Sequence, residues 1–156
     1  MTIPNMTLDP AILRSSFELV SDRRPDLTMR FYEILFERYP QLEKLFSRDR
    51  TAQSNMLAGA IAAVLDHLED APWLQSTLGS LGAKHTTYGV TEEMYGMVGD
   101  ALLATLAEVA AEALTPVVAA QWTEAYGAIA GMMQAGAHPL ATERVTTRGI
   151  SAAGSQ

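Results

Sequence analysis

The stretch LGAKHTTYGVTEEMYGMVGDALLATL, residues 81–106, decides the fold. Its first part completes a stripe of apolar positions at helical spacing that ends in His85, and a second such stripe begins at Met94. Between them, Gly89 is typical of a helix C-terminus and Thr91 is typical of an N-cap. The stretch therefore predicts two helices joined by a short turn, with a histidine at the end of the first apolar face.

Working outward from this stretch, helical periodicity recurs along the chain and alternating strand patterns are missing. Proline and capping residues mark further helix starts. The expected helical segments begin at or near Asp9, Pro25, Pro40, Gln53, Pro72 and Thr115. The sequence therefore predicts an all-α domain of about six to eight helices, without an internal repeat.

Two segments lack helical periodicity. Residues 47–52, SRDRTA, are expected to form a polar loop, and the tail from His138 is expected to be disordered. We therefore expect one domain over residues 1–138 and a disordered tail over residues 139–156. Outside the apolar stripes, His67 and His138 are expected to be solvated.

Composition limits the possible functions. The chain has 156 residues, a net charge of −7 and no cysteine. The acidic balance disfavours nucleic acids and anionic membranes as partners, and the missing cysteines exclude disulfides and thiolate metal ligands. Without a run of 18 apolar residues or a basic, apolar leader, no membrane span is expected and a cytoplasmic location is the default.

His85 has two interpretations. It is either a core residue with both ring nitrogens satisfied, or a metal ligand whose second nitrogen is held by an acceptor. A cage of protein ligands alone is disfavoured, because the chain has no cysteine and no cluster of carboxylates with histidine. A single histidine suffices where a cofactor supplies the other ligands, as haem does through its porphyrin nitrogens.

At this point the chain resembles globins of the bacterial flavohaemoglobin and single-domain haemoglobin branch. Four stretches carry the resemblance and cover most of residues 10–134: RFYEILFERYPQLEKLF, AQSNMLAGAIAAVLDHLE, LGAKHTTYGVTEEMYGMVGDALLATL and AQWTEAYGAIAGMM. The third is the most specific, with a tyrosine ten residues after the histidine and then VGDALLATL. The resemblance implies a globin fold of three helices packed over three around one haem b (iron protoporphyrin IX), with O2, NO and CO as ligands.

The resemblance also implies a role for each matching residue. His85 would be the proximal iron ligand, buttressed by Tyr95. Tyr32 would donate a hydrogen bond to bound oxygen on the distal side, where Gln53 is the matching glutamine. The other residues implied to contact the haem or lie near its edge are Phe46, Leu57, Leu81, Lys84 and Val90.

The residues alone leave some of these roles open. Tyr32 and Phe46 can equally be core residues of apolar segments. The loop before Gln53 is shorter than in the relatives, so Ser54 or Met56 can turn inward in its place. Only the structure can choose between these alternatives.

Two departures from the family pattern bear on activity. Flavohaemoglobins carry a glutamate on the last helix that joins the tyrosine and the proximal histidine, and here Ala137 or a close neighbour stands at that position. A carboxylate acceptor makes an imidazole more basic, so its loss should weaken oxygen activation. The chain also ends where a flavin and nicotinamide domain would begin, so we expect a separate reductase as the electron donor.

Three hypotheses follow. The first is a haem-iron oxygen-binding globin and candidate nitric oxide dioxygenase, in which Tyr32 and Gln53 stabilise developing charge. The alternative is a non-catalytic oxygen carrier or store, or a diatomic-gas sensor. A third is a globin fold without haem that acts as an interaction module, for which His85 would be a satisfied core residue. Either a monomer or a homodimer is compatible with all three.

Overall fold

The computed structural model describes residues 8–46 and 49–137, and these residues form helices and connecting turns without strands. His138 and the expected tail lie outside the described residues. The elements run in the order α1 (Pro10–Arg23), α2 (Leu27–Arg38), the 3-10 helix η2 (Pro40–Leu45), α3 (Arg50–Asp66), α4 (Ala71–Thr87), α5 (Glu92–Ala110), the 3-10 helix η3 (Ala111–Ala113) and α6 (Pro116–Ala137).

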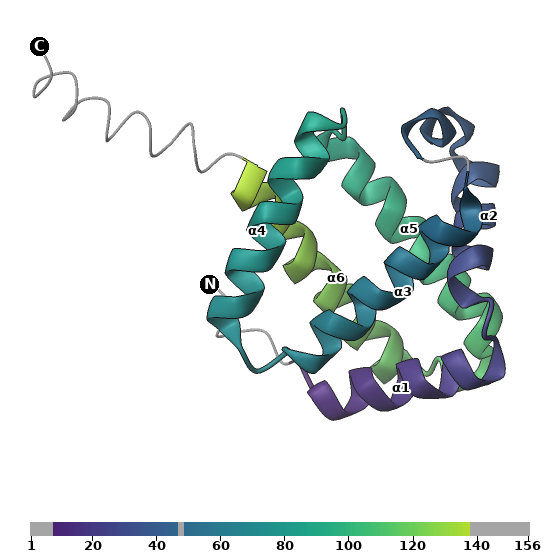
Figure 1. Ribbon diagram of the computed structural model, residues 1–156. Coiled ribbons are helices and arrows are strands. Elements are labelled where there is room, and N and C mark those ends of the chain that lie inside the picture. Colours follow the sequence, from purple (N-terminus) through teal and green to yellow (C-terminus); the bar gives the residue numbers. More distant parts are fainter. Residues whose placement is uncertain (1–7, 47–48, 138–156) are drawn as a thin grey trace, which may run out of the picture.

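The helices pack in two layers of three, which confirms the predicted globin fold. One layer holds α1, α3 and α4, and the other holds α2, α5 and α6, with contacts between layers from α1 to α5 and α6, α2 to α3, and α4 to α6. In Figure 1, the end of α3 lies next to the start of α4 and the two helices diverge from this point, with α5 and α6 behind them.

Aspartate side chains set the beginnings of three helices. Asp9 accepts hydrogen bonds from the first-turn N–H groups of α1, Asp49 accepts one from Ala52 at 3.0 Å, and Asp70 accepts one from Trp73 at 3.2 Å. The prediction of a loop is therefore wrong for residues 50–52, which belong to α3. Once Asp49 satisfies a free N–H group, the helix can begin at Arg50.

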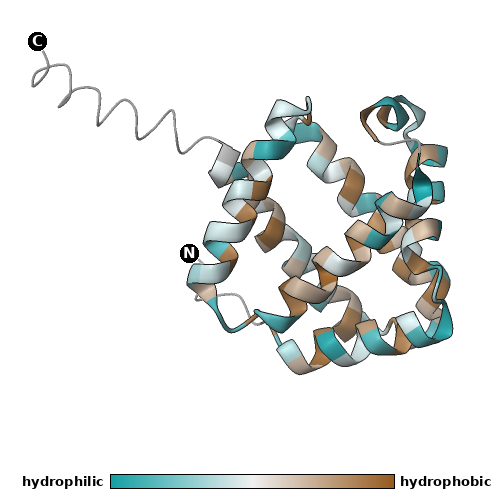
Figure 2. Cartoon of the chain, in the orientation of Figure 1, coloured by the Kyte–Doolittle hydropathy of each residue, from teal (hydrophilic) through white to brown (hydrophobic). Residues whose placement is uncertain are grey.

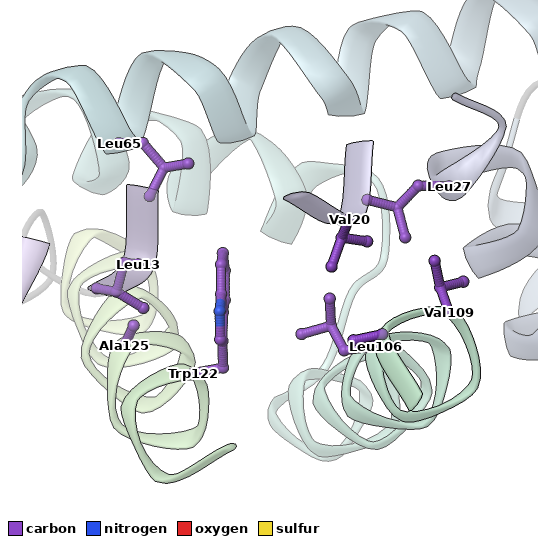
Figure 3. Close-up of a cluster of buried hydrophobic side chains, with 9 residues drawn as sticks. Leu13, Val20, Leu27, Leu65, Leu106, Val109, Trp122 and Ala125 are labelled. Carbon is purple, nitrogen blue, oxygen red and sulfur yellow. The ribbon is translucent and has the colours of Figure 1, made fainter. Parts of the chain in front are cut away.

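The main core lies where α1, α3, α5 and α6 meet. The Trp122 ring stands between two groups of aliphatic side chains and donates a hydrogen bond from Nε1 to Ser16 Oγ at 2.8 Å (Figure 3). Leu13 is fully buried in this core. Hydrophobic and hydrophilic residues alternate along α1, as expected for a helix with one buried face (Figure 2).

Helix α5 is strongly apolar in composition and contributes six buried residues. By length and composition alone, residues 92–113 could cross a membrane, which the expectation of no span did not foresee. In this fold the same helix packs against α1, α2 and α6 and buries Ala101, Thr105 and Leu106. Core packing therefore accounts for its composition.

Helices α4 and α6 approach each other closely through glycines. A Cβ atom on Gly82 would overlap the backbone of Met133, and one on Gly136 would overlap the backbone of Gly79. Only glycine allows this separation. The contact fixes the position of α4 relative to α6, and therefore also the position of His85.

Candidate functional site

An apolar cavity of about 250 Å³ lies between α3 and α4 and extends toward α6. Its lining includes all of the predicted site residues except Gln53 and Lys84. Lys84 is exposed on α4, and its place near a cofactor edge stays a prediction. The residues in the lining are Tyr32, Phe46, Leu57, Leu81, His85, Val90 and Tyr95. The structure places these residues around one cavity, whereas their roles toward a cofactor stay predictions.

His85 lies in the last turn of α4 and is half-buried. Its Nδ1 is 2.8 Å from the carbonyl oxygen of Leu81, which can only accept a hydrogen bond. Nδ1 must therefore carry the proton, and the lone pair of a neutral ring stays on Nε2. Just beyond, Gly89 adopts a φ of +95° and ends the helix.

Tyr32, another residue of the cavity lining, is 3% exposed and belongs to α2. Burial raises the pKa of its phenol above 10, while a hydrogen bond with the Gln53 side chain and the charge of Arg50 lower it in part. The net direction is upward, so the hydroxyl is protonated at neutral pH and can act as a donor. Gln53 thus contacts Tyr32 although it does not line the cavity.

The three candidate side chains at the start of α3 differ in their exposure and in their contacts. Met56 is 69% exposed and points away from the interior. Ser54 does turn inward, but toward α2, where its hydroxyl lies 3.6 Å from the sulfur of Met29. Of these three side chains, Gln53 is the one that contacts the buried Tyr32 hydroxyl.

Two tyrosines, Tyr95 of α5 and Tyr126 of α6, also line the cavity. The Tyr95 hydroxyl is buried and has no hydrogen-bond partner among the described residues, and burial raises the pKa of its phenol. Tyr126, on α6, lines the same cavity and donates a hydrogen bond from its hydroxyl to the Tyr95 carbonyl at 2.7 Å. The sequence analysis missed Tyr126, although it lies one helical turn after Trp122 and so shares its face.

His67 differs from its expectation. It is half-buried at the end of α3, where its ring stacks on Trp73 with 3.7 Å between centroids and its Nδ1 lies 2.8 Å from the Ala63 carbonyl. The predicted solvated histidine is therefore wrong, because the turn between α3 and α4 brings a large aromatic ring over it. His67 does not line the cavity.

The donor set fits a macrocyclic metal cofactor. Within residues 8–46 and 49–137 no group of three or more His, Cys, Asp or Glu residues can hold a metal ion. The cavity offers one imidazole nitrogen, the buried phenol of Tyr32 from another helix and a mostly apolar lining. A cofactor that brings its own equatorial ligands is the kind of group that such a site can accept.

Comparison with known proteins gives the family. The profile of the globin family matches residues 29–133. The chain is 36% identical over 118 residues to a flavohemoprotein from Vibrio cholerae and 33% identical over 122 residues to one from Rhodopirellula baltica. These matches cover 74% and 76% of this chain but 30% of each relative. The chain therefore belongs to the globin family and spans about a third of the length of these relatives.

Two solved structures are similar to this one. A bacterial globin from Campylobacter jejuni has a TM-score of 0.72 and 26% identity, and the match covers 85% of this chain and 96% of that chain. A carbene transferase engineered from a candidate nitric oxide dioxygenase of Rhodothermus marinus has a TM-score of 0.74 and 23% identity, with 89% and 99% covered. The second likeness supports the fold alone.

Proposed function

We propose that this chain is a haem globin that holds one haem b between α3 and α4, with His85 Nε2 as the iron ligand. When bound, the haem iron supplies a site for O2, NO or CO. The proposal is supported by one observation above others. Tyr32, a buried and protonated phenol, and His85, an imidazole with a free Nε2, line the same apolar cavity from different helices.

Different residues would orient the iron ligand, donate a hydrogen bond to a bound gas and exclude water. The hydrogen bond to the Leu81 carbonyl orients the His85 ring, so that Nε2 faces a fixed direction. Tyr32 donates a hydrogen bond to a ligand that gains negative charge, and Gln53 orients that hydroxyl. The aliphatic lining excludes water, which strengthens both interactions.

Within this function, we propose conversion of NO and O2 to nitrate as the finer activity, with a reductase supplying the electron. The flavohemoprotein relatives are longer than this chain, and the part outside the match is a possible counterpart of that donor. Oxygen storage, transport or gas sensing is the second candidate. It is favoured by the acceptor at His85 Nδ1, which is a neutral carbonyl and makes the imidazole less basic than a carboxylate would.

The distal assignment is tested by Tyr32→Phe. A hydrogen bond to a charged group contributes about 1.5–3 kcal/mol, so oxygen should dissociate about 10- to 100-fold faster from the variant. Stopped-flow spectroscopy of the reduced, haem-loaded chain measures this rate. The control is Tyr39→Phe, since the Tyr39 hydroxyl bonds Asp100 at 2.9 Å on the surface and should leave the rate unchanged. An unchanged rate in Tyr32→Phe would remove Tyr32 from the site.

The two finer activities separate under turnover. With NADPH and an added ferredoxin reductase or flavodoxin reductase, a dioxygenase consumes NO faster than it autoxidises. A carrier or sensor autoxidises at least as fast as it consumes NO. An NO electrode and the visible spectrum follow the two processes in the same sample.

A further inference from the structure

Arg50 lies where α2, η2 and α3 meet. These three elements carry the residues proposed for the distal side. Arg50 is the first residue of α3. Its Nη2 lies 3.1 Å from Glu43 Oε2 of η2, and its Cζ lies 4.7 Å from the centre of the Phe36 ring of α2. One side chain therefore contacts both neighbours of the helix on which it stands.

Each of these elements carries a residue of the distal site. Tyr32 lies one turn before Phe36 on α2, Phe46 is the C-cap of η2, and Gln53 lies three residues after Arg50 on α3. The three aromatic rings also pack on one another, with centroid distances of 5.9 Å for Tyr32–Phe36, 5.4 Å for Tyr32–Phe46 and 5.3 Å for Phe36–Phe46. Arg50 covers the edge of this aromatic cluster.

The environment of Arg50 differs from that of an ordinary surface cation. Its side chain is 32% exposed, and its Nε is buried with no hydrogen-bond partner among residues 8–46 and 49–137. Partial removal from water strengthens both the ion pair and the cation–ring contact. The guanidinium charge also acts on the Tyr32 phenol, whose pKa it lowers in part.

We propose that Arg50 is a positioning residue for the distal side. It holds the first turn of α3 against α2 and η2, and thereby keeps the Gln53 amide within reach of the Tyr32 hydroxyl. Its effect on a haem ligand rests on the proposed function, whereas its effect on α3 does not. The two effects can be measured separately.

The first measurement uses the haem-free full chain. In Arg50→Met, hydrogen exchange of the backbone amides of residues 53–57 should become about 3- to 10-fold faster than in the unchanged protein, as expected for the loss of one net interaction. Arg50→Lys keeps the charge and should restore part of the protection. The matched control is Arg14→Met, because Arg14 ties the other end of α3 through the Leu65 carbonyl at 2.8 Å and Glu69 at 2.7 Å.

The exchange result decides the structural half of the proposal. Faster exchange at residues 53–57 in Arg50→Met but not in Arg14→Met supports it. Unchanged exchange, or an equal increase in both variants, overturns it. Neither outcome depends on haem.

The second measurement uses the haem-loaded chain. Arg50→Met should shift the C–O stretching band of bound CO and speed oxygen dissociation by about 3- to 10-fold, because Gln53 no longer orients Tyr32. If Arg50 acts through Gln53, the double variant Arg50→Met, Gln53→Leu dissociates oxygen no faster than Gln53→Leu alone. Multiplying effects would overturn the positioning role. A chain that takes up no haem refutes the proposed function instead, and leaves the exchange result standing.

Discussion

At the scale of single residues, the cavity-lining tyrosines Tyr95 and Tyr126 are the most informative pair. Both phenols are screened from water, and burial raises the pKa of each. They differ in hydrogen bonding, since Tyr126 donates to the Tyr95 carbonyl at 2.7 Å while the buried Tyr95 hydroxyl has no partner in the part of the chain that the structure describes. A buried hydroxyl that is not hydrogen-bonded costs stability.

The pair gives a prediction for the haem-free chain. Tyr126→Phe should lower the free energy of unfolding by about 0.5–1.5 kcal/mol, because it removes the hydrogen bond to the Tyr95 carbonyl. Tyr95→Phe should leave this free energy unchanged or raise it by up to about 1 kcal/mol. Urea denaturation followed by circular dichroism measures both. A larger loss in Tyr95→Phe than in Tyr126→Phe would show that the Tyr95 hydroxyl has a partner.

At the scale of elements, the contact between α4 and α6 positions the site. Gly82 lies three residues before His85, at the point where α4 meets the backbone of Met133. A methyl group cannot enter this contact without moving one helix. The position of His85 at the cavity thus depends on Gly82, which has no side chain.

Gly82→Ala should therefore destabilise the protein and loosen the haem. Overpacking of this kind costs about 1–3 kcal/mol, measured as the free energy of unfolding. Haem transfer to an apomyoglobin acceptor should also become faster than in the unchanged chain. The control is Gly131→Ala on α6, where a Cβ meets nothing within 4 Å and alanine should stabilise the helix by about 0.5–1 kcal/mol. Equal stability of both variants would contradict the close approach.

The helices could be predicted from the sequence, because apolar periodicity is a local signal. The start of α3 could not, since Asp49 caps it from within a stretch that reads as a polar loop. Contacts between helices join residues that are far apart in the sequence, so a local pattern does not predict them. The contacts of Arg50 and of the α4 glycines could therefore be identified only from the arrangement of α2, α3 and α6 in space.

The site could be predicted mainly through the family resemblance, which named positions that now lie around one cavity. Periodicity alone left His85 and Tyr32 between a core role and a ligand role. Lys84 was placed near the cofactor by resemblance, but at an exposed position of α4 its side chain is outside the cavity lining. Tyr126 was overlooked because it reads as one more residue of an apolar helix face.

At the scale of the whole molecule, burial of phenols makes folding sensitive to alkali. Burial raises the pKa of Tyr32, Tyr95 and Tyr126 above 10 in the folded chain. Above pH 10 the unfolded chain releases these protons while the folded chain keeps them. The unfolded state is then favoured, so stability is complete below pH 10 and declines as the pH rises further.

This gives the predicted pH profile. The free energy of unfolding of the haem-free chain should be lower at pH 11 than at pH 9, by at most about 1.4 kcal/mol per pH unit for each phenol that stays protonated. Urea titrations at a series of pH values measure it. Tyr32→Phe should flatten the decline, because its phenol is nearly inaccessible to water at 3% exposure. A profile that rises above pH 10 would contradict the burial of these groups.

The central claim is that the globin fold of this chain holds haem through His85, and it is tested most directly by haem titration. Haem is added to the haem-free full chain, to His85→Ala and to His67→Ala, and the absorption spectrum is recorded after reduction and addition of CO. His67 is the matched control, since it also bonds a backbone carbonyl at 2.8 Å but lies outside the cavity. We predict one haem per chain in the unchanged protein and in His67→Ala, and loss of the histidine-ligated spectrum in a folded His85→Ala. The same spectrum in His85→Ala, or no haem uptake by the unchanged chain, would contradict the account.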